Sequence, residues 1–274
     1  MLGRWFSLPP AVPGAHAGLD EAIALVTERI GHEPGNAELY RMRGDLYREG
    51  EDFRRSRDDY EHARTLEPSL PGIDLRIGRA ALEAGRSGEA LAALDVAILC
   101  EPGSVEAFLL RARTNVALGR AADAVADFDR ALDLSVPPAS PQPELYIERA
   151  RAAVADGDRQ GALRGLDRGL GRLGPLITLD LEALDIELSI PDPQAALARL
   201  DRIAARSARK EQWLSRRGDI LASLGERREA RAAFEAALKA LSLVPSSRRE
   251  TPATRALEAH VQSSLALLAK EARP

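Results

Sequence analysis

A recurring interval of 34 residues is the feature that most constrains how this chain can fold. Pro34, Pro68 and Pro102 stand 34 residues apart in the sequence. Small residues recur with nearly the same period. With each unit numbered so that its first small residue is position 8, these residues are Gly44, Gly78, Ala112, Ala150, Ala183 and Gly218. A period sustained from Pro34 to Pro245 predicts one array of similar units, each in contact only with its neighbours.

Each unit contains two helical patterns. In the clearest unit, Val105 to Val136, apolar and small residues recur every three or four positions on both sides of Gly119. This is the spacing of one helix face. Small residues also recur at positions 20 and 27 of the units, and a larger side chain between two helices would separate them at a cost of about 1–3 kcal/mol. Each unit is therefore predicted to be a pair of closely packed helices.

The units resemble the tetratricopeptide repeat, a helix-turn-helix unit of 34 residues with an aromatic, small, small, aromatic, proline signature. Eight of the 11 aromatic residues fall on signature positions: Tyr40, Tyr47, Phe53, Tyr60, Phe108, Phe128, Tyr146 and Phe234. The resemblance implies an all-α fold, a right-handed α-solenoid of stacked antiparallel helix pairs.

The phase of the signature divides most of the chain into six repeats flanked by single helices. We expect repeats at residues 37–68, 71–102, 105–137, 143–175, 176–207 and 211–245, a half-repeat helix at 19–34 and a capping helix at 251–272. Four extra residues and four prolines between Val136 and Pro143 predict a local bulge. In the fifth repeat, Ile190 to Pro193 replaces the usual glycine turn, which predicts a distorted unit.

The N-terminal residues leave the cellular compartment open. Residues 1–18 are expected to be a flexible leader or the remnant of a signal peptide. Ala15-His16-Ala17 resembles a signal-peptidase site, but three prolines interrupt the short apolar stretch before it. A cytoplasmic location is slightly favoured, and no run approaches the ~18 apolar residues of a membrane span. Cys100 is the only cysteine, so it cannot form an internal disulfide, and we interpret it as a buried structural thiol.

Composition and motifs give no indication of catalysis. The chain has 38 basic and 42 acidic residues, which does not favour nucleic acid or an anionic membrane as a partner. The four histidines are far apart in sequence, and no nucleophile, phosphate-binding or metal-ligand motif is present. We expect no enzyme activity, no metal and no cofactor. The basic stretch from Arg199 to Arg231 is interpreted as a solvated helical face.

Two arginine–aspartate pairs are expected to be structural. Position 7 holds Arg43 and Arg111 in the same repeats whose position 23 holds Asp59 and Asp127. In the family that the repeats resemble, these positions face each other across the helix pair. We therefore predict ion pairs Arg43–Asp59 and Arg111–Asp127, each contributing about 0–1 kcal/mol.

The resemblance also implies a candidate binding surface. In tetratricopeptide arrays, positions 2, 5, 9, 12 and 13 of the first helices line a concave groove. These positions give an arginine column beside an apolar strip: Arg79, Arg113 and Arg151 at position 9, with Leu75, Leu109 and Ile147 at position 5. Such a column suits a peptide with carboxylates or backbone carbonyls. Alternatively, Glu83, Glu106 and Glu144 neutralise the arginines in a solvated lattice.

The sequence supports three hypotheses about function. The first is a non-catalytic scaffold or adaptor that binds a protein or peptide segment in the groove. The others are a structural or envelope-assembly subunit that uses its ends or convex face, and a peptide-sensing regulator. Chaperone-tail clamps of this fold carry lysine and asparagine where this chain has Arg41, Asp45 and Glu106, so a chaperone co-factor role is disfavoured.

Overall fold

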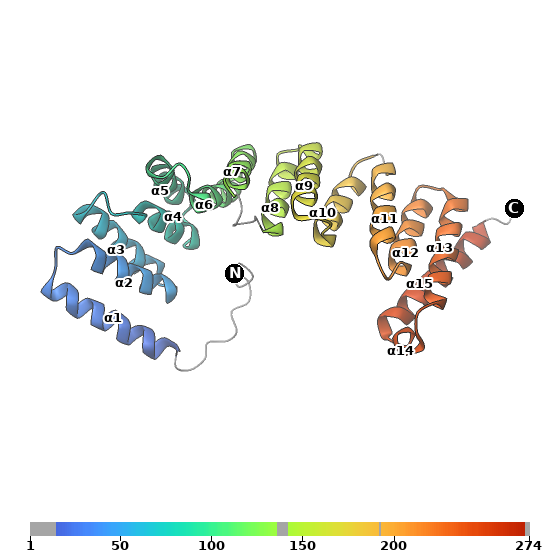
Figure 1. Ribbon diagram of the computed structural model, residues 1–274, viewed down its shortest axis with the longest axis horizontal. Coiled ribbons are helices and arrows are strands. Elements are labelled where there is room, and N and C mark those ends of the chain that lie inside the picture. The colour runs from blue at the N-terminus through green and yellow to red at the C-terminus, as the bar shows by residue number, and fades with distance from the viewer. Residues whose placement is uncertain (1–14, 136–141, 192, 272–274) are drawn as a thin grey trace. The chain divides into compact units, whose positions relative to one another are not determined.

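The computed structural model describes residues 15–135, 142–191 and 193–271, and within these ranges it contains helices and no strand (Figure 1). The all-α expectation is correct. The helices are α1 (Ala15–His32), α2 (Ala37–Glu49), α3 (Phe53–Leu66), α4 (Ile73–Glu83), α5 (Ser87–Cys100), α6 (Val105–Ala117), α7 (Ala121–Leu134), α8 (Pro143–Ala155), α9 (Arg159–Leu173), α10 (Ile177–Leu188), α11 (Gln194–Arg206), α12 (Glu211–Ser223), α13 (Arg227–Ser242), α14 (Ser246–Arg249) and α15 (Pro252–Glu271).

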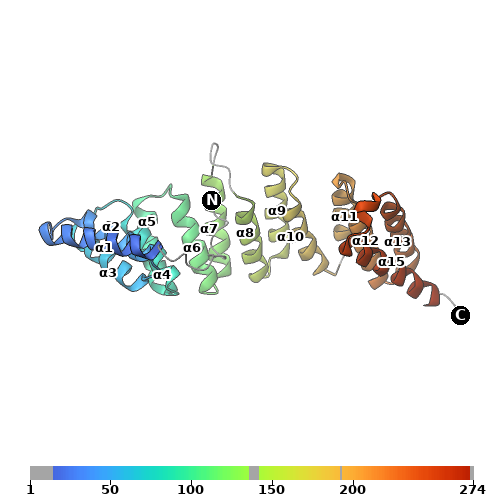
Figure 2. The ribbon, with the colours of Figure 1, turned by 90° about the horizontal axis from the view of Figure 1, so that it is seen from below.

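The helices form two compact units, one with α1 to α7 and the other with most of α8 and with α9 to α15. In the N-terminal unit, α2 packs on α3, α4 on α5 and α6 on α7, and each pair stacks on the next through α3–α4 and α5–α6 contacts (Figures 1 and 2). Helix α1 covers α2. In the C-terminal unit the same succession runs from α9 to α13, and α15 packs on α13 and α12. Each unit is a solenoid of stacked antiparallel helix pairs.

The small residues at position 8 lie where two helices of a pair approach most closely. A Cβ atom on Gly44 would stand 2.6 Å from Tyr60 Cε1, and one on Gly218 would stand 2.6 Å from Phe234 Cε1. Ala112 is fully buried at the equivalent place. The helices therefore nest through the recurring small residues.

Short polar segments begin and turn the helices. The side chain of the residue before a helix accepts a hydrogen bond from a backbone N–H of the first turn at Asn36, Asp52, Ser104 and Asp158. Between the two helices of a pair, the chain adopts positive φ at Gly85, Gly119, Gly157 and Gly225. The first pair differs, because Glu51 has a φ of 61° at this place.

The N-terminal helix begins earlier than expected. Helix α1 starts at Ala15, four residues before the expected start at Leu19, so Ala15-His16-Ala17 belongs to its first turn. Alanine has the highest helix propensity, which favours this extension. The remainder of the expected leader, residues 1–14, and residues 136–141 of the bulge expected between Val136 and Pro143 lie outside the described residues.

Candidate interaction surface

The first helices of the N-terminal unit share one continuous face. Residues three, four or seven positions apart lie on the same side of a helix, and this spacing relates the candidate residues on each of α2, α4 and α6. We call this surface the first-helix face. It comprises Arg41, Asp45 and Arg48 on α2, Leu75, Arg79 and Glu83 on α4, and Glu106, Leu109, Arg113 and Val116 on α6.

Ion pairs between successive repeats connect this face. Arg76 Nε of α4 donates to Asp45 Oδ1 of α2 at 3.2 Å, and Tyr60 Oη donates to the same oxygen at 2.7 Å. Arg48 Nη1 of α2 lies 3.3 Å from Glu83 Oε1 of α4. Arg79 of α4 pairs with Glu106 of α6. The arginines are thus held within a charge-paired lattice that runs across α2, α4 and α6.

Burial within the lattice shifts the pKa values of Arg79 and Glu83. Burial, and then the positive charge of Arg48, lower the pKa of the Arg79 guanidinium. Burial raises the pKa of the Glu83 carboxyl, against the opposing effects of Arg48 and Arg79. Glu83 Oε2 is buried and has no hydrogen-bond donor among the described residues. The charges here are therefore only partly compensated by the protein itself.

The face becomes more apolar toward α6. Leu75, Leu109 and Arg113 are half-buried, and Val116 is 51% exposed. Val116 occupies position 12 of its repeat but was not among the site residues predicted from the sequence. Its place on the same helix face as Leu109 and Arg113, at spacings of seven and three residues, is the signal that identifies it. An apolar segment could pack on this end of the face.

The third member of the predicted arginine column belongs to the C-terminal unit. Arg151 on α8 is exposed and donates from Nε and Nη2 to Glu182 Oε1 and Oε2 on α10, at 2.8 and 2.9 Å. Its partner is therefore Glu182, and not Glu144 as in the lattice alternative. Ile147, one turn earlier on α8, is half-buried. Arg79 and Arg113 lie in the other unit.

Both predicted arginine–aspartate pairs are present within helix pairs. Arg43 Nε and Nη2 donate to the two Asp59 carboxylate oxygens, each at 2.7 Å. Arg111 makes the same two-point contact with Asp127, at 3.0 and 2.7 Å, and also reaches Asp95 of α5 at 2.8 Å. The hydrogen bonding that Arg43 donates to Asp59 is the main cause of a raised pKa at Arg43. These arginines join helices.

A buried ionic cluster in the fifth helix pair was not predicted. Arg199 of α11 is 2% exposed and donates to Glu187 at 3.0 Å, Asp180 at 3.3 Å and Asp167 at 3.0 Å. The interpretation of the basic stretch as a solvated face is wrong for Arg199. Once one residue is inserted into this repeat, Arg199 falls at position 23, where other repeats carry Asp59 and Asp127. Here this position holds the cation, and two of its acids, Asp180 and Glu187, lie on the first helix α10.

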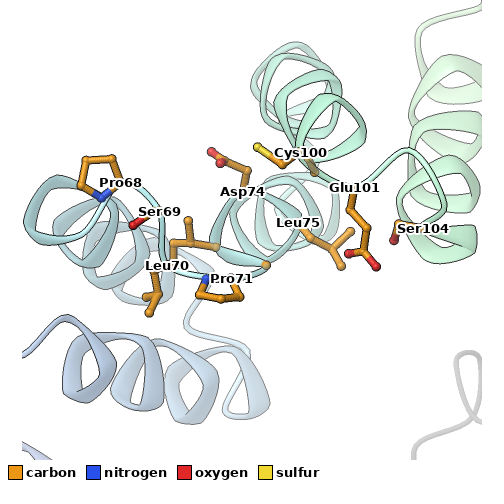
Figure 3. Close-up of a pocket in the computed structure, with 12 residues that line it drawn as sticks. Pro68, Ser69, Leu70, Pro71, Asp74, Leu75, Cys100, Glu101 and Ser104 are labelled. Atoms are coloured by element: carbon orange, nitrogen blue, oxygen red, sulfur yellow. The ribbon is translucent and has the colours of Figure 1, made fainter.

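A surface pocket lies between the α3–α4 loop and the end of α5 (Figure 3). It is lined by Pro68, Leu70, Asp74 and Cys100 among others, and Asp74 accepts a hydrogen bond from Arg64 at 3.0 Å. Cys100 is exposed, so its interpretation as a buried thiol is wrong. It follows Val96 by four residues, and both face outward from α5.

Two tetratricopeptide repeat models match successive parts of the chain. One tetratricopeptide repeat model matches residues 41–98 and 75–142, and a tetratricopeptide repeat-like domain model matches residues 142–250. The chain belongs to the tetratricopeptide repeat family. Tetratricopeptide repeats are in general non-catalytic modules for protein interaction. No curated protein sequence matched the chain. Among residues 15–135, 142–191 and 193–271, none of the helices combines the length and apolar character needed to cross a membrane.

Solved tetratricopeptide repeat structures share the fold at low sequence identity. The C-terminal part of a repeat protein from Cytophaga hutchinsonii is 12% identical, with a TM-score of 0.55 over 92% of this chain and 91% of that chain. A tetratricopeptide repeat protein from Parabacteroides merdae is 17% identical, with a TM-score of 0.53 over 90% and 93%. YrrB, described as having an unusual peptide-binding site, is 18% identical, with a TM-score of 0.52 over 62% and 84%.

Proposed function

We propose that this tetratricopeptide repeat protein is a non-catalytic scaffold that binds a peptide or protein segment on the first-helix face of its N-terminal unit. The observation that carries the proposal is the continuity of this face across three stacked helices, with charged groups on α2, α4 and α6 and apolar groups on α4 and α6. YrrB, of similar fold, is described as a peptide-binding protein, which favours a peptide as the client class.

The chemistry of the face suits an extended segment. Leu109 and Val116 offer apolar contacts, and the guanidinium groups of Arg79 and Arg113 can donate hydrogen bonds to carboxylates or backbone carbonyls. The apolar contacts would supply most of the binding free energy because burial of apolar area is the main favourable term in association. The ionic groups would fix the direction and register of the segment.

Client capture by charge-reversed variants tests this proposal. Arg113→Glu, alone and with Arg151→Glu, is expected to abolish recovery of a co-purified client from the native host lysate while leaving the helical content by circular dichroism unchanged. Arg54→Glu is the matched control, because Arg54 is exposed on the second helix α3 and lies outside the first-helix face. If Arg113→Glu and Arg54→Glu recover the same amount of client, the first-helix face is not the binding surface.

A second candidate function has one observation in its favour. Helix α5 presents Val96 and Leu99 outward, and Leu99 is 80% exposed. An outward apolar strip of this kind suits an assembly subunit that associates through its convex face. Under this alternative, Leu99→Ser would reduce recovery of the partner, and Arg113→Glu would leave it unchanged.

A further inference from the structure

The charged form of Arg79 depends on the ion pair with Glu106 more strongly than the charged form of Glu106 depends on Arg79. The Arg79 side chain is 28% exposed and that of Glu106 is 50% exposed. Glu106 lies in the first turn of α6, where the helix dipole stabilises a carboxylate without any cation. Arg79 is half-buried near Arg48, and burial and that second positive charge both disfavour its charged form. Loss of the ion pair therefore costs less free energy at Glu106 than at Arg79.

The neighbouring charged groups of the face are paired in other ways. Arg48 and Glu83 form a sheltered pair, with side chains that are 27% and 13% exposed. Arg76 is bound to Asp45 and also donates to the Gly72 carbonyl at 3.3 Å. The Arg79–Glu106 contact is therefore the one inter-repeat ion pair of this face, among those described, in which the carboxylate is more exposed than the arginine and also rests on a helix N-terminus.

The position of Glu106 on α6 also sets the spacing between the acidic and apolar residues of a ligand. Leu109 and Val116 follow it on the same side of α6, and Val116 lies about 15 Å along the helix at 1.5 Å per residue. An extended segment covers this distance with roughly four or five residues at 3.3 Å each. In a segment that runs parallel to α6, a carboxylate placed at Arg79 would thus precede the apolar side chains on Leu109 and Val116 by a few residues.

We infer that Glu106 is an internal competitor for the site: it occupies Arg79 in place of a client carboxylate, and the client is a segment with an acidic residue followed by apolar residues. The inference rests on the proposed function and specifies its ligand class. Binding exchanges one carboxylate for another, so the arginine is never left unpaired. Acidic molecules without the apolar residues gain little from the exchange, which gives specificity.

Removing the competitor should strengthen binding. The probe is a short fluorescein-labelled peptide with paired glutamates followed by paired leucines, measured by fluorescence anisotropy, with glutamine and lysine versions for comparison. Glu106→Gln is expected to tighten binding of the acidic peptide about five-fold, the scale of one partly exposed ion pair. The gain should shrink as salt concentration rises. Glu61→Gln, which changes an acid on α3 whose side chain is 46% exposed, is the matched control and should change nothing.

A double variant identifies the group that is released. In Arg79→Gln, the additional change Glu106→Gln is expected to give no gain, and the acidic peptide should lose its advantage over the glutamine version. The inference is overturned if Glu106→Gln does not increase the affinity for the acidic peptide, or if it still does so in Arg79→Gln. It is also overturned if no variant binds the acidic peptide. The glutamine or lysine peptide could instead bind as well as the acidic one, with Arg113→Glu abolishing that binding. This result would support peptide binding on the first-helix face and contradict the role of Glu106 as a competitor. If Arg113→Glu leaves client capture unchanged, the proposed function itself fails.

Discussion

At the scale of single residues, the small side chains determine how closely the helices of a pair can pack. Helix α9 offers a direct comparison. A Cβ atom on Gly169 would lie 2.8 Å from Tyr146 Cγ and 3.0 Å from Leu179 Cδ1, whereas one on Gly171 would meet nothing within 4 Å. Gly169→Ala is therefore expected to lower the free energy of unfolding by about 1–3 kcal/mol.

Gly171→Ala is the control in the same helix. Because glycine is less favourable than alanine in a helix, this change should raise stability by roughly 0.5–1 kcal/mol. Urea denaturation followed by circular dichroism measures both variants. Equal effects at the two positions would show that Gly169 is not a packing contact.

Glu51 is the exception among the turn residues. Its φ of 61° lies in the left-handed region that four other pairs fill with glycine, and a residue with a side chain pays about 1–2 kcal/mol there. Glu51→Gly should raise the melting temperature, and Glu51→Ala should not. A lower melting temperature for Glu51→Gly would mean that the Glu51 side chain contributes more than its backbone strain costs.

At the scale of elements, Arg199 connects α9, α10 and α11 through three carboxylates. Removing it leaves Glu187 buried without its cation and Asp180 paired with Arg206 alone, so Arg199→Leu is expected to cost about 3–5 kcal/mol. Arg231→Leu, which breaks an exposed pair with Glu235 within one helix, should cost less than about 1 kcal/mol. Denaturant titrations compare the two. A small loss for Arg199→Leu would indicate that this cluster is hydrated in solution.

Glu83 predicts a pH dependence for the contact between α2 and α4. Burial raises its pKa above the ordinary value of 4.5, so the folded protein binds this proton more tightly than the unfolded chain does. Stability from this group is then present below pH 4.5 and is lost as the pH rises through the folded pKa. The stability of the wild type relative to Glu83→Gln should fall over this range in thermal denaturation. A rise in this relative stability with pH would mean that the charge of Arg48 outweighs the effect of burial on Glu83.

The sequence was most informative where the repeat phase is regular. The contacts of Gly44 and Gly218 and the two-point Arg43–Asp59 pair follow from fixed positions within a unit, because each helix pair repeats the same local geometry. The burial of Arg199 does not follow from the repeat pattern in the same way, because the fifth repeat has one extra residue that shifts its positions. Cys100 was misplaced because both faces of α5 are apolar, so periodicity did not distinguish the outward face from the core.

At the scale of the whole molecule, the ion pairs between repeats could not be predicted from the positions of residues within a repeat. The column of Arg79, Arg113 and Arg151 follows from position 9, but the partners Glu106 and Glu182 depend on side-chain contacts between repeats. The column is divided between two compact units, and each unit presents its own first helices. The N-terminal unit alone combines Arg79 and Arg113 with the apolar residues of α6, so the proposal is confined to it.

Photocrosslinking from two positions tests this assignment most directly. A photoactivatable amino acid is placed at Leu109, on the first-helix face, or at Leu99, on the outward side of α5. The proposed scaffold predicts that a bound client crosslinks from position 109 and not from position 99, and that Arg113→Glu abolishes the crosslink. Crosslinking from position 99 alone would contradict binding on the first-helix face and favour assembly through the outward surface.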